Sequence, residues 1–190
     1  MSDALKRIEK GIEKLATQQE EICKRLERLE QIRGVAAASG ASRREVLAFL
    51  DRFRAAESLG EASTGAWVEV CENACLRGGL RVVQQREGFH ARLLEARLRA
   101  LGGEPRAEIP AERVEKVLAA TGSRERSDAR KLLAATRQSP DIDAAVAPIL
   151  DLAERLDDDP ETQSLLRNIA ADERATLEFL HDACRQLNAA

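Results

Sequence analysis

Apolar residues recur every three or four positions along two adjacent stretches, residues 43–71 and 73–101, and this spacing constrains the fold more than any other feature. The two stripes, with the polar residues inside them, are Val46, Leu50, Phe53, Glu57, Gly60, Thr64, Trp67 and Cys71, then Leu76, Leu80, Val83, Glu87, His90, Leu94, Leu98 and Leu101. Residues three and four apart share one face of an α-helix, so each stretch is predicted to be a long amphipathic helix. A turn near Asn73 would fold the two into a hairpin.

The composition favours helices throughout the chain. Aromatic residues make up only 3% of the sequence and tyrosine is absent, whereas the helix formers Ala, Leu, Glu and Arg dominate. The sequence therefore predicts an all-α protein.

Charge and apolar patterning exclude several classes of partner. The net charge is −3 with both signs mixed, and no stretch forms a basic face, so we expect no nucleic acid. Nothing resembles a signal peptide, and no apolar run approaches the ~20 residues that span a bilayer, so we expect no membrane contact. The four cysteines are scattered, which favours a reducing cytoplasm.

The N-terminal part carries a heptad pattern over residues 3–33. One core position holds Leu5, Ile12, Gln19, Leu26 and Arg33, and the other holds Ile8, Leu15, Ile22 and Leu29. We predict a coiled-coil helix over residues 1–33 that assembles copies of the chain into a homo-oligomer. The alternative is a solvated amphipathic helix that folds back on its own domain. The small residues at 34–42 predict a flexible linker, and residues 43–190 form the main domain.

Helix-start and helix-stop signals divide the rest of the chain. The second helix ends before Gly102, Gly103 and Pro105, and a connection of over twenty residues, holding a short helix at 110–120, runs to about Ser127. Ser139-Pro140-Asp141 and Asp159-Pro160-Glu161 each predict a helix start with proline at the first helical position. Two further long helices would complete a bundle with a long crossover.

Two glutamates interrupt the apolar stripes. Glu57 and Glu87 lie about 15 residues, or roughly 22 Å, on either side of the turn near residue 72, so they are expected to face each other. His90 follows Glu87 at the i+3 spacing, on the same helix face. A carboxylate and an imidazole so placed can bind one metal ion together.

An internal repeat extends this layer. A shift of 86 residues aligns Glu87 with Glu173, His90 with Thr176 and Glu57 with Asp143. A shift of 91 residues would instead superpose Glu178 and His181 on Glu87 and His90, but it destroys the apolar pattern. Glu178 also points about 140° away from Glu173 on a helix. We therefore predict that Glu178 is exposed and that His181 lies outside the site.

On these residues the chain resembles the ferritin-like superfamily, and within it the rubrerythrin-like proteins, over about residues 43–188. The resemblance rests on Glu57, on Glu87-Gly-Phe-His90, on Ala171-Asp-Glu173, on two similar hairpins and on the long connection. It implies an antiparallel four-helix bundle that holds a di-iron centre between its hairpins.

The resemblance also implies a role for each matching residue. Glu57 would be a terminal ligand of one metal, Glu87 a bridging ligand, His90 the imidazole ligand, and Asp143 and Glu173 the terminal and bridging acids of the other hairpin. Thr176 stands where a second histidine is expected, and Asp143 is shorter than the usual glutamate. We therefore expect at most one tightly bound ion, iron or manganese. That ion should first occupy the half of the site that Glu57, Glu87 and His90 form.

No nucleophile, phosphate-binding or nucleotide motif points elsewhere, so two hypotheses remain. The first is a ferritin-like iron or manganese protein that handles iron, oxygen or peroxide, a di-iron-type oxidoreductase with an incomplete site, clustered by its coiled coil. The second is a metal-free ferritin-like scaffold that acts through oligomerisation and a protein partner, with its buried carboxylates paired to arginines.

Overall fold

The computed structural model describes residues 40–189, so the predicted coiled coil and most of the predicted linker lie outside the described residues. Regular structure in this part of the chain is entirely helical. The helices are α2 (Arg43–Val68), α3 (Ala74–Ala100), α4 (Ala111–Thr121), α5 (Asp128–Gln138), α6 (Ile142–Glu154) and α7 (Pro160–Ala189). The predicted all-α class is confirmed. None of these helices is both long enough and apolar enough to cross a bilayer.

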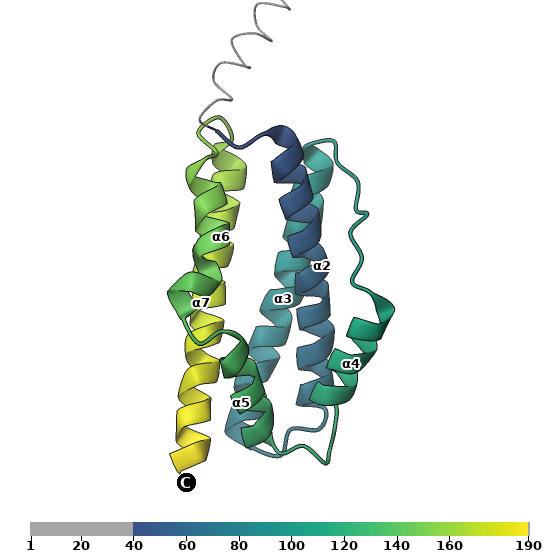
Figure 1. The fold of residues 1–190 in the computed structure, drawn as a ribbon, viewed down its shortest axis with the longest axis vertical. Helices are drawn as coiled ribbons and strands as arrows, with labels where there is room; N and C mark the ends of the chain where they lie inside the picture. The colour runs from purple at the N-terminus through teal and green to yellow at the C-terminus, as the bar shows by residue number, and fades with distance from the viewer. Residues whose placement is uncertain (1–39, 190) are drawn as a thin grey trace, which may run out of the picture. The chain divides into compact units, whose positions relative to one another are not determined.

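Helices α2 and α3 form the first hairpin (Figure 1). The Ser42 side chain caps α2 by accepting a hydrogen bond from the Glu45 amide at 3.2 Å, as the sequence predicts. Asn73 caps α3 in the same way, accepting from the Leu76 amide at 2.9 Å. Both caps satisfy amides that have no partner within the helix, so these residues fix where the helices begin.

Helices α6 and α7 form the second hairpin, and α7 begins at Pro160 as predicted. Arg97, near the end of α3, ties the two hairpins together. Its Nη2 donates to Asp159 Oδ1 at 2.6 Å and its Nε donates to Thr162 Oγ1 at 2.7 Å. The C-terminal end of α3 is thereby held against the N-terminal end of α7.

The connection between the hairpins passes along α2 and carries α4 and α5 (Figure 1). Asp51 of α2 fixes its start by accepting hydrogen bonds from the amides of Arg106 at 3.0 Å and Ala107 at 2.7 Å. Helix α4, close to the predicted 110–120, packs on α2, and α5 packs on α7. The connection therefore runs the length of the helical body and brings α5 beside the second hairpin.

The sequence predicts one long helix from Pro140, whereas the structure has the 13-residue helix α6 there and a separate helix, α5, before it. Pro140 has no amide hydrogen and disfavours a helical conformation in the residue before it, so α5 ends at Gln138. Helix α6 starts two residues beyond the predicted first position, with Asp141 as its cap. The junction between α5 and α6 thus lies at residues 139–141.

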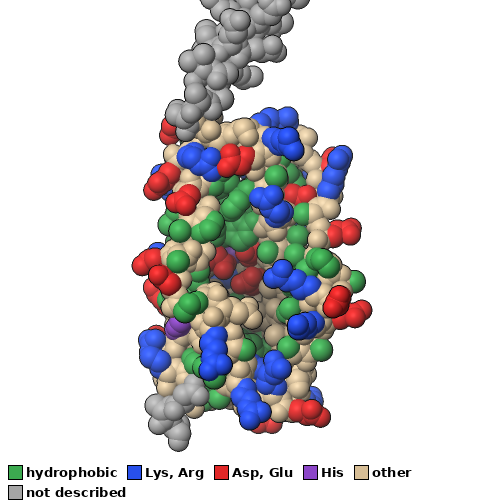
Figure 2. Space-filling view, in the orientation of Figure 1, with side chains coloured by type: hydrophobic (Ala, Val, Ile, Leu, Met, Phe, Trp, Pro, Cys, Tyr) green, Lys and Arg blue, Asp and Glu red, His purple; other side chains and the backbone are tan. Residues whose placement is uncertain are grey.

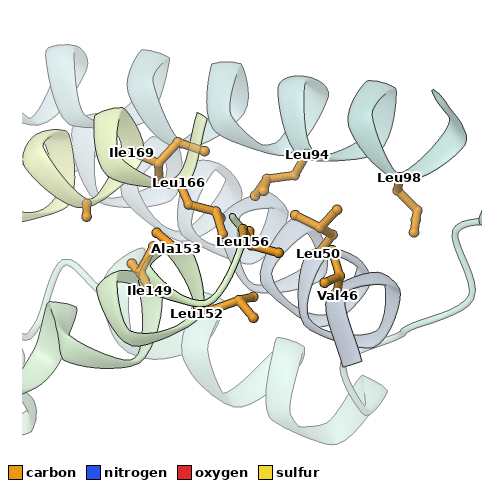
Figure 3. Close-up of a cluster of buried hydrophobic side chains, with 11 residues drawn as sticks. Val46, Leu50, Leu94, Leu98, Ile149, Leu152, Ala153, Leu156, Leu166 and Ile169 are labelled. Atoms are coloured by element: carbon orange, nitrogen blue, oxygen red, sulfur yellow. The ribbon is translucent and has the colours of Figure 1, made fainter. Parts of the chain in front are cut away.

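The apolar core has two separate parts. The first, drawn in Figure 3, is built from α2, α3, α6 and α7 and includes Val46, Leu50, Leu94, Leu98, Ile149, Leu152, Ala153, Leu156, Leu166, Ile169 and Ala170. The second lies toward the α2–α3 turn and includes Trp67, Val68, Cys71, Leu76, Leu80, Leu132 and Cys184. Along each of α2, α3 and α7 a polar segment separates the two parts.

Candidate metal centre

Three ionisable side chains meet in the polar layer between the two parts of the core. Glu57 comes from α2, His90 from α3 and Glu173 from α7, and one ligand atom of each lies within 4.8 Å of the others. Glu57 and His90 are buried, while Glu173 is partly exposed. In Figure 2, acidic side chains gather in a hollow about halfway along the visible face. The cluster therefore has two buried members, Glu57 and His90, and one member, Glu173, that solvent reaches.

His90 lies at the centre of this cluster, with 1% of its surface exposed. Its Nδ1 is 3.2 Å from Glu57 Oε2 and 3.3 Å from Glu173 Oε1, and its Nε2 is 3.1 Å from Asp172 Oδ2. Burial alone would lower the pKa of His90, but the nearby carboxylates of Glu173, Glu57 and Asp172 outweigh it and raise the pKa to about 10. Without a metal ion, the ring is an imidazolium that donates from both nitrogens.

Glu173 Oε1 forms an ion pair with His90 Nδ1 at 3.3 Å but accepts no hydrogen bond. The single Nδ1 hydrogen of His90 is directed at Glu57, and the buried Oε1 atom of Glu173 has no hydrogen-bond partner. Thr176 Oγ1, one turn further along α7, is buried and equally without a partner. Buried polar atoms without partners are rare and costly, so their presence here favours a site that is completed by a ligand.

Glu87 supplies a further carboxyl group beside Glu57. Burial, reinforced by the charges of Glu57 and Glu173, raises the pKa of Glu87 to about 9, so it is protonated at neutral pH and hydrogen-bonds Glu57. Burial also raises the pKa of Glu57. The two glutamates predicted to face each other across the first hairpin do so, which confirms that part of the sequence analysis.

Gly60 makes room for Glu87 and was not predicted to belong to the site. A β-carbon at residue 60 would overlap the Glu87 carboxyl group. The signal in the sequence is a glycine inside the α2 stripe, three residues after Glu57, where an apolar side chain would otherwise be expected. The glycine therefore allows the carboxyl group to lie against the backbone of α2.

No arginine or lysine neutralises the cluster. Among residues 40–189, the ion pairs of Glu57, Asp172 and Glu173 are all with His90, and Glu87 has none. The pairing with arginine predicted by the scaffold hypothesis is therefore not found in the described part of the chain. One imidazolium faces several carboxyl groups, and this excess of negative charge suits a cation.

Asp143 lies outside the cluster, contrary to the predicted convergence of five residues. It sits in the first turn of α6, its side chain is 83% exposed, and its Oδ1 is 2.6 Å from Arg174 Nη2. An acidic residue in a first turn is stabilised by the helix dipole while facing water, so nothing draws Asp143 inward. Asp172, for which the sequence predicts no role, is the fourth acid instead.

Glu178 and His181, which have the same spacing as Glu87 and His90, are not part of the site, as predicted. Glu178 is exposed on α7. His181 Nε2 lies 2.8 Å from the carbonyl oxygen of Ser139 at the α5–α6 junction, so this histidine makes an interhelical hydrogen bond. The register given by the shift of 86 residues, which places Glu173 beside His90, is therefore the correct one for α7.

The residues present fit a metal ion. Metal–ligand bonds of about 2.0–2.2 Å require ligand atoms within roughly 4.4 Å of one another. His90 Nδ1 is within this limit of both glutamates, at 3.2 Å and 3.3 Å, and the whole set lies within 4.8 Å, so a small inward movement brings all three to one ion. His90 Nδ1 is the nitrogen nearest both glutamates, while Nε2 is held by Asp172. A carboxylate that fixes the second nitrogen of a ligating histidine is a common feature of metal sites.

Comparison with known proteins identifies no relative: no family model, no curated protein and no solved structure matches the chain. The class of protein that the described residues define is an all-helical one with a cluster of carboxylates around a buried histidine. The function is therefore inferred from the geometry of that cluster.

Proposed function

We propose that the cluster binds one divalent transition-metal ion, iron or manganese, and that the protein is a ferritin-like metal-binding protein. Glu57, His90 and Glu173 are the ligands, and Glu87 adds a carboxyl group beside Glu57. The observation that carries the proposal is the meeting of three ligand atoms from three helices within 4.8 Å, one of them a buried carboxylate oxygen without a donor. The two hairpins and the long connection support the ferritin-like architecture.

Oxygen ligands with a single imidazole suit iron and manganese, and zinc competes for such a set. Either of the first two ions, once bound, supplies one-electron redox chemistry. The protein's own residues hold the ion and set its access to water. Glu57 and His90 are closed to solvent, whereas Glu173 is 19% exposed and Asp172 is 47% exposed. We propose that oxygen or peroxide reaches the ion from the side of α7.

A second candidate is a metal-free scaffold, and one observation favours it. Protonated His90 contacts three carboxylates at 3.1 to 3.3 Å and so supplies a positive charge of its own. In this case the polar layer is a structural element, and the protein acts through association with itself or with a protein partner.

Metal analysis decides between the metal-binding protein and the metal-free scaffold. The full chain is purified without chelator, its metal content is measured, and iron(II) or manganese(II) is titrated into the metal-free protein by calorimetry. We expect at most one tight ion per chain. His90→Ala should abolish binding, because it removes the central ligand, and His181→Ala is the matched control that should leave it nearly unchanged.

Two results would overturn the metal proposal. One is the absence of any saturable metal binding together with higher thermal stability of Glu57→Gln and Glu87→Gln, which would support the scaffold. The other is unchanged affinity in His90→Ala. Two equally tight ions would show that the half sites are equivalent and that the single-ion assignment is wrong.

A further inference from the structure

A cavity of about 260 Å³ lies between α2, α4 and α5 and shares no residue with the candidate metal centre. Its walls are formed by Trp67 from α2, Leu80 and Val83 from α3, Val117 from α4 and Leu180 from α7, with several alanines. Figure 1 shows α4 and α5 flanking the end of the helical body where α2 turns into α3. The cavity is mostly apolar, but one buried and one exposed cationic residue line it.

The first charge is Lys131 of α5, which is 95% buried, with 5% of its surface exposed, and lines the cavity. Its Nζ lies 5.9 Å from the centre of the Trp67 ring, a cation–π contact. Among residues 40–189, no carboxylate or other acceptor lies within hydrogen-bonding distance of this ammonium group. Burial lowers the pKa of Lys131, against the opposing charge of Asp128.

Asp128, one turn before Lys131, is not available as its partner. Asp128 Oδ1 accepts from Trp67 Nε1 at 2.8 Å. Asp128 Oδ2 accepts from the amides of Glu72 at 3.0 Å and Asn73 at 3.2 Å, and from the Cys71 thiol at 3.3 Å. Both oxygens are thus occupied in holding α5 to the α2–α3 turn.

The second charge is Arg126, which lines the same cavity just before α5. Buried Lys131 and exposed Arg126 beside an apolar wall favour an anion over a metal ion, because a buried ammonium group without a hydrogen-bonded acceptor is costly. Ser63, Thr64 and Gln138 add hydrogen-bonding groups at the wall.

We propose that this cavity binds a small organic acid, with its carboxylate against Lys131 and Arg126 and its short apolar chain against Trp67. The cavity corresponds to about nine water volumes, so a ligand of roughly ten non-hydrogen atoms fills it. That size matches a medium-chain carboxylate and excludes long-chain lipids and nucleotides. The site is independent of the candidate metal centre.

The single tryptophan of the chain reports on this site, because Trp67 forms one of its walls. The full chain, treated with chelator, is titrated with octanoate and with octan-1-ol, which has the same chain but no charge. We expect a saturable change in Trp67 fluorescence and an affinity for octanoate about tenfold or more above that for octanol, since hydrogen bonds to charged groups contribute about 1.5–3 kcal/mol. Equal affinities, or no saturable signal, overturn the proposal.

Variants on one helix test the role of the buried charge. Lys131→Met keeps most of the side-chain volume and should lower octanoate affinity about tenfold or more, with little change for octanol. Arg137→Met, at an exposed position of α5, is the matched control and should bind as the native chain does. Calorimetry gives the affinities independently of Trp67. Unchanged octanoate binding in Lys131→Met contradicts the proposal, and if that variant fails to fold, the comparison of octanoate with octanol in the native chain still decides.

Discussion

Gly60 of α2 faces Glu87 of α3 so closely that the Glu87 carboxyl group occupies the space a β-carbon at residue 60 would take. Gly60→Ala should therefore displace Glu87 and weaken metal binding, although alanine is by itself a better helix former by about 1 kcal/mol. Gly78→Ala is the matched control in α3, because nothing lies within 4 Å of the β-carbon it adds. We expect Gly78→Ala to raise stability by up to about 1 kcal/mol with unchanged metal affinity.

Metal titration and thermal unfolding of the two glycine variants give the test. Equal metal affinity in Gly60→Ala and in the native chain would show that Glu87 is not needed at the site. A loss of stability in Gly78→Ala would contradict the open space seen around that glycine.

The lowered pKa of Asp128 predicts how the stability of the fold changes in acid. Burial would raise the pKa of Asp128, but hydrogen bonds from Trp67, Asn73, Cys71 and Glu72 outweigh it and hold the pKa below its usual range. A carboxyl group with a lowered folded pKa stabilises the fold above its unfolded pKa, and this stabilisation is lost as the pH falls through the folded pKa. Asp128→Asn should therefore cost about 1–3 kcal/mol at pH 7 and reduce the loss of stability below about pH 4.

Urea unfolding at a series of pH values measures this effect. Asp158→Asn is the control, because Asp158 is exposed and accepts no hydrogen bond within the described part of the chain. The same acid dependence in Asp128→Asn and the native chain would mean that Asp128 does not hold α5 to the α2–α3 turn.

The sequence predicted the parts of the fold that depend on local signals. Ser42 and Pro160 mark helix starts through capping and backbone geometry, and the spacing of Glu57, Glu87 and His90 places them in one layer because a helix is regular. The repeat located Glu173 correctly, since the apolar residues that flank it must reach the same core.

The parts that were not predicted depend on contacts between distant segments. Asp143 aligns with Glu57 by the repeat, but its side chain is exposed in the first turn of α6, where it pairs with Arg174. Asp172 points to His90 from the edge of α7, and no pattern in a single sequence distinguishes such an acid from a solvated one. The proposed anion site likewise needs Lys131 beside Trp67, and the two residues meet only when α5 is folded against α2.

The heptad pattern of residues 3–33 predicts that the N-terminal segment sets the oligomeric state. A chain starting at Gly40 should have fewer subunits than the full chain by light scattering, with unchanged helicity of its remaining part. Polar replacement of Leu15 and Ile22, two apolar core positions of the heptads, should have the same effect without truncation. The same subunit number in all three proteins would exclude the coiled coil.

Two buried threonines test whether the layer around His90 is complete without a ligand. Thr176 Oγ1 has no hydrogen-bond partner, whereas Thr162 Oγ1 accepts from Arg97 and donates to Asp159. Valine has nearly the shape of threonine but no hydroxyl group, so each substitution removes only the polar atom. In metal-free protein, Thr176→Val should raise stability by about 1 kcal/mol, because it removes a buried group that nothing satisfies.

Thr162→Val should instead lower stability by about 1–3 kcal/mol, since it leaves Arg97 Nε without its acceptor and Asp159 Oδ2 without its donor around a fully buried side chain. Urea unfolding of both variants, with and without added iron(II) or manganese(II), shows whether the Thr176 hydroxyl group lacks a partner. If Thr176→Val destabilises the metal-free protein as much as Thr162→Val does, the hydroxyl group already has a partner, such as an ordered water. The layer would then be complete without an ion, and the scaffold hypothesis would gain the support that the metal proposal loses.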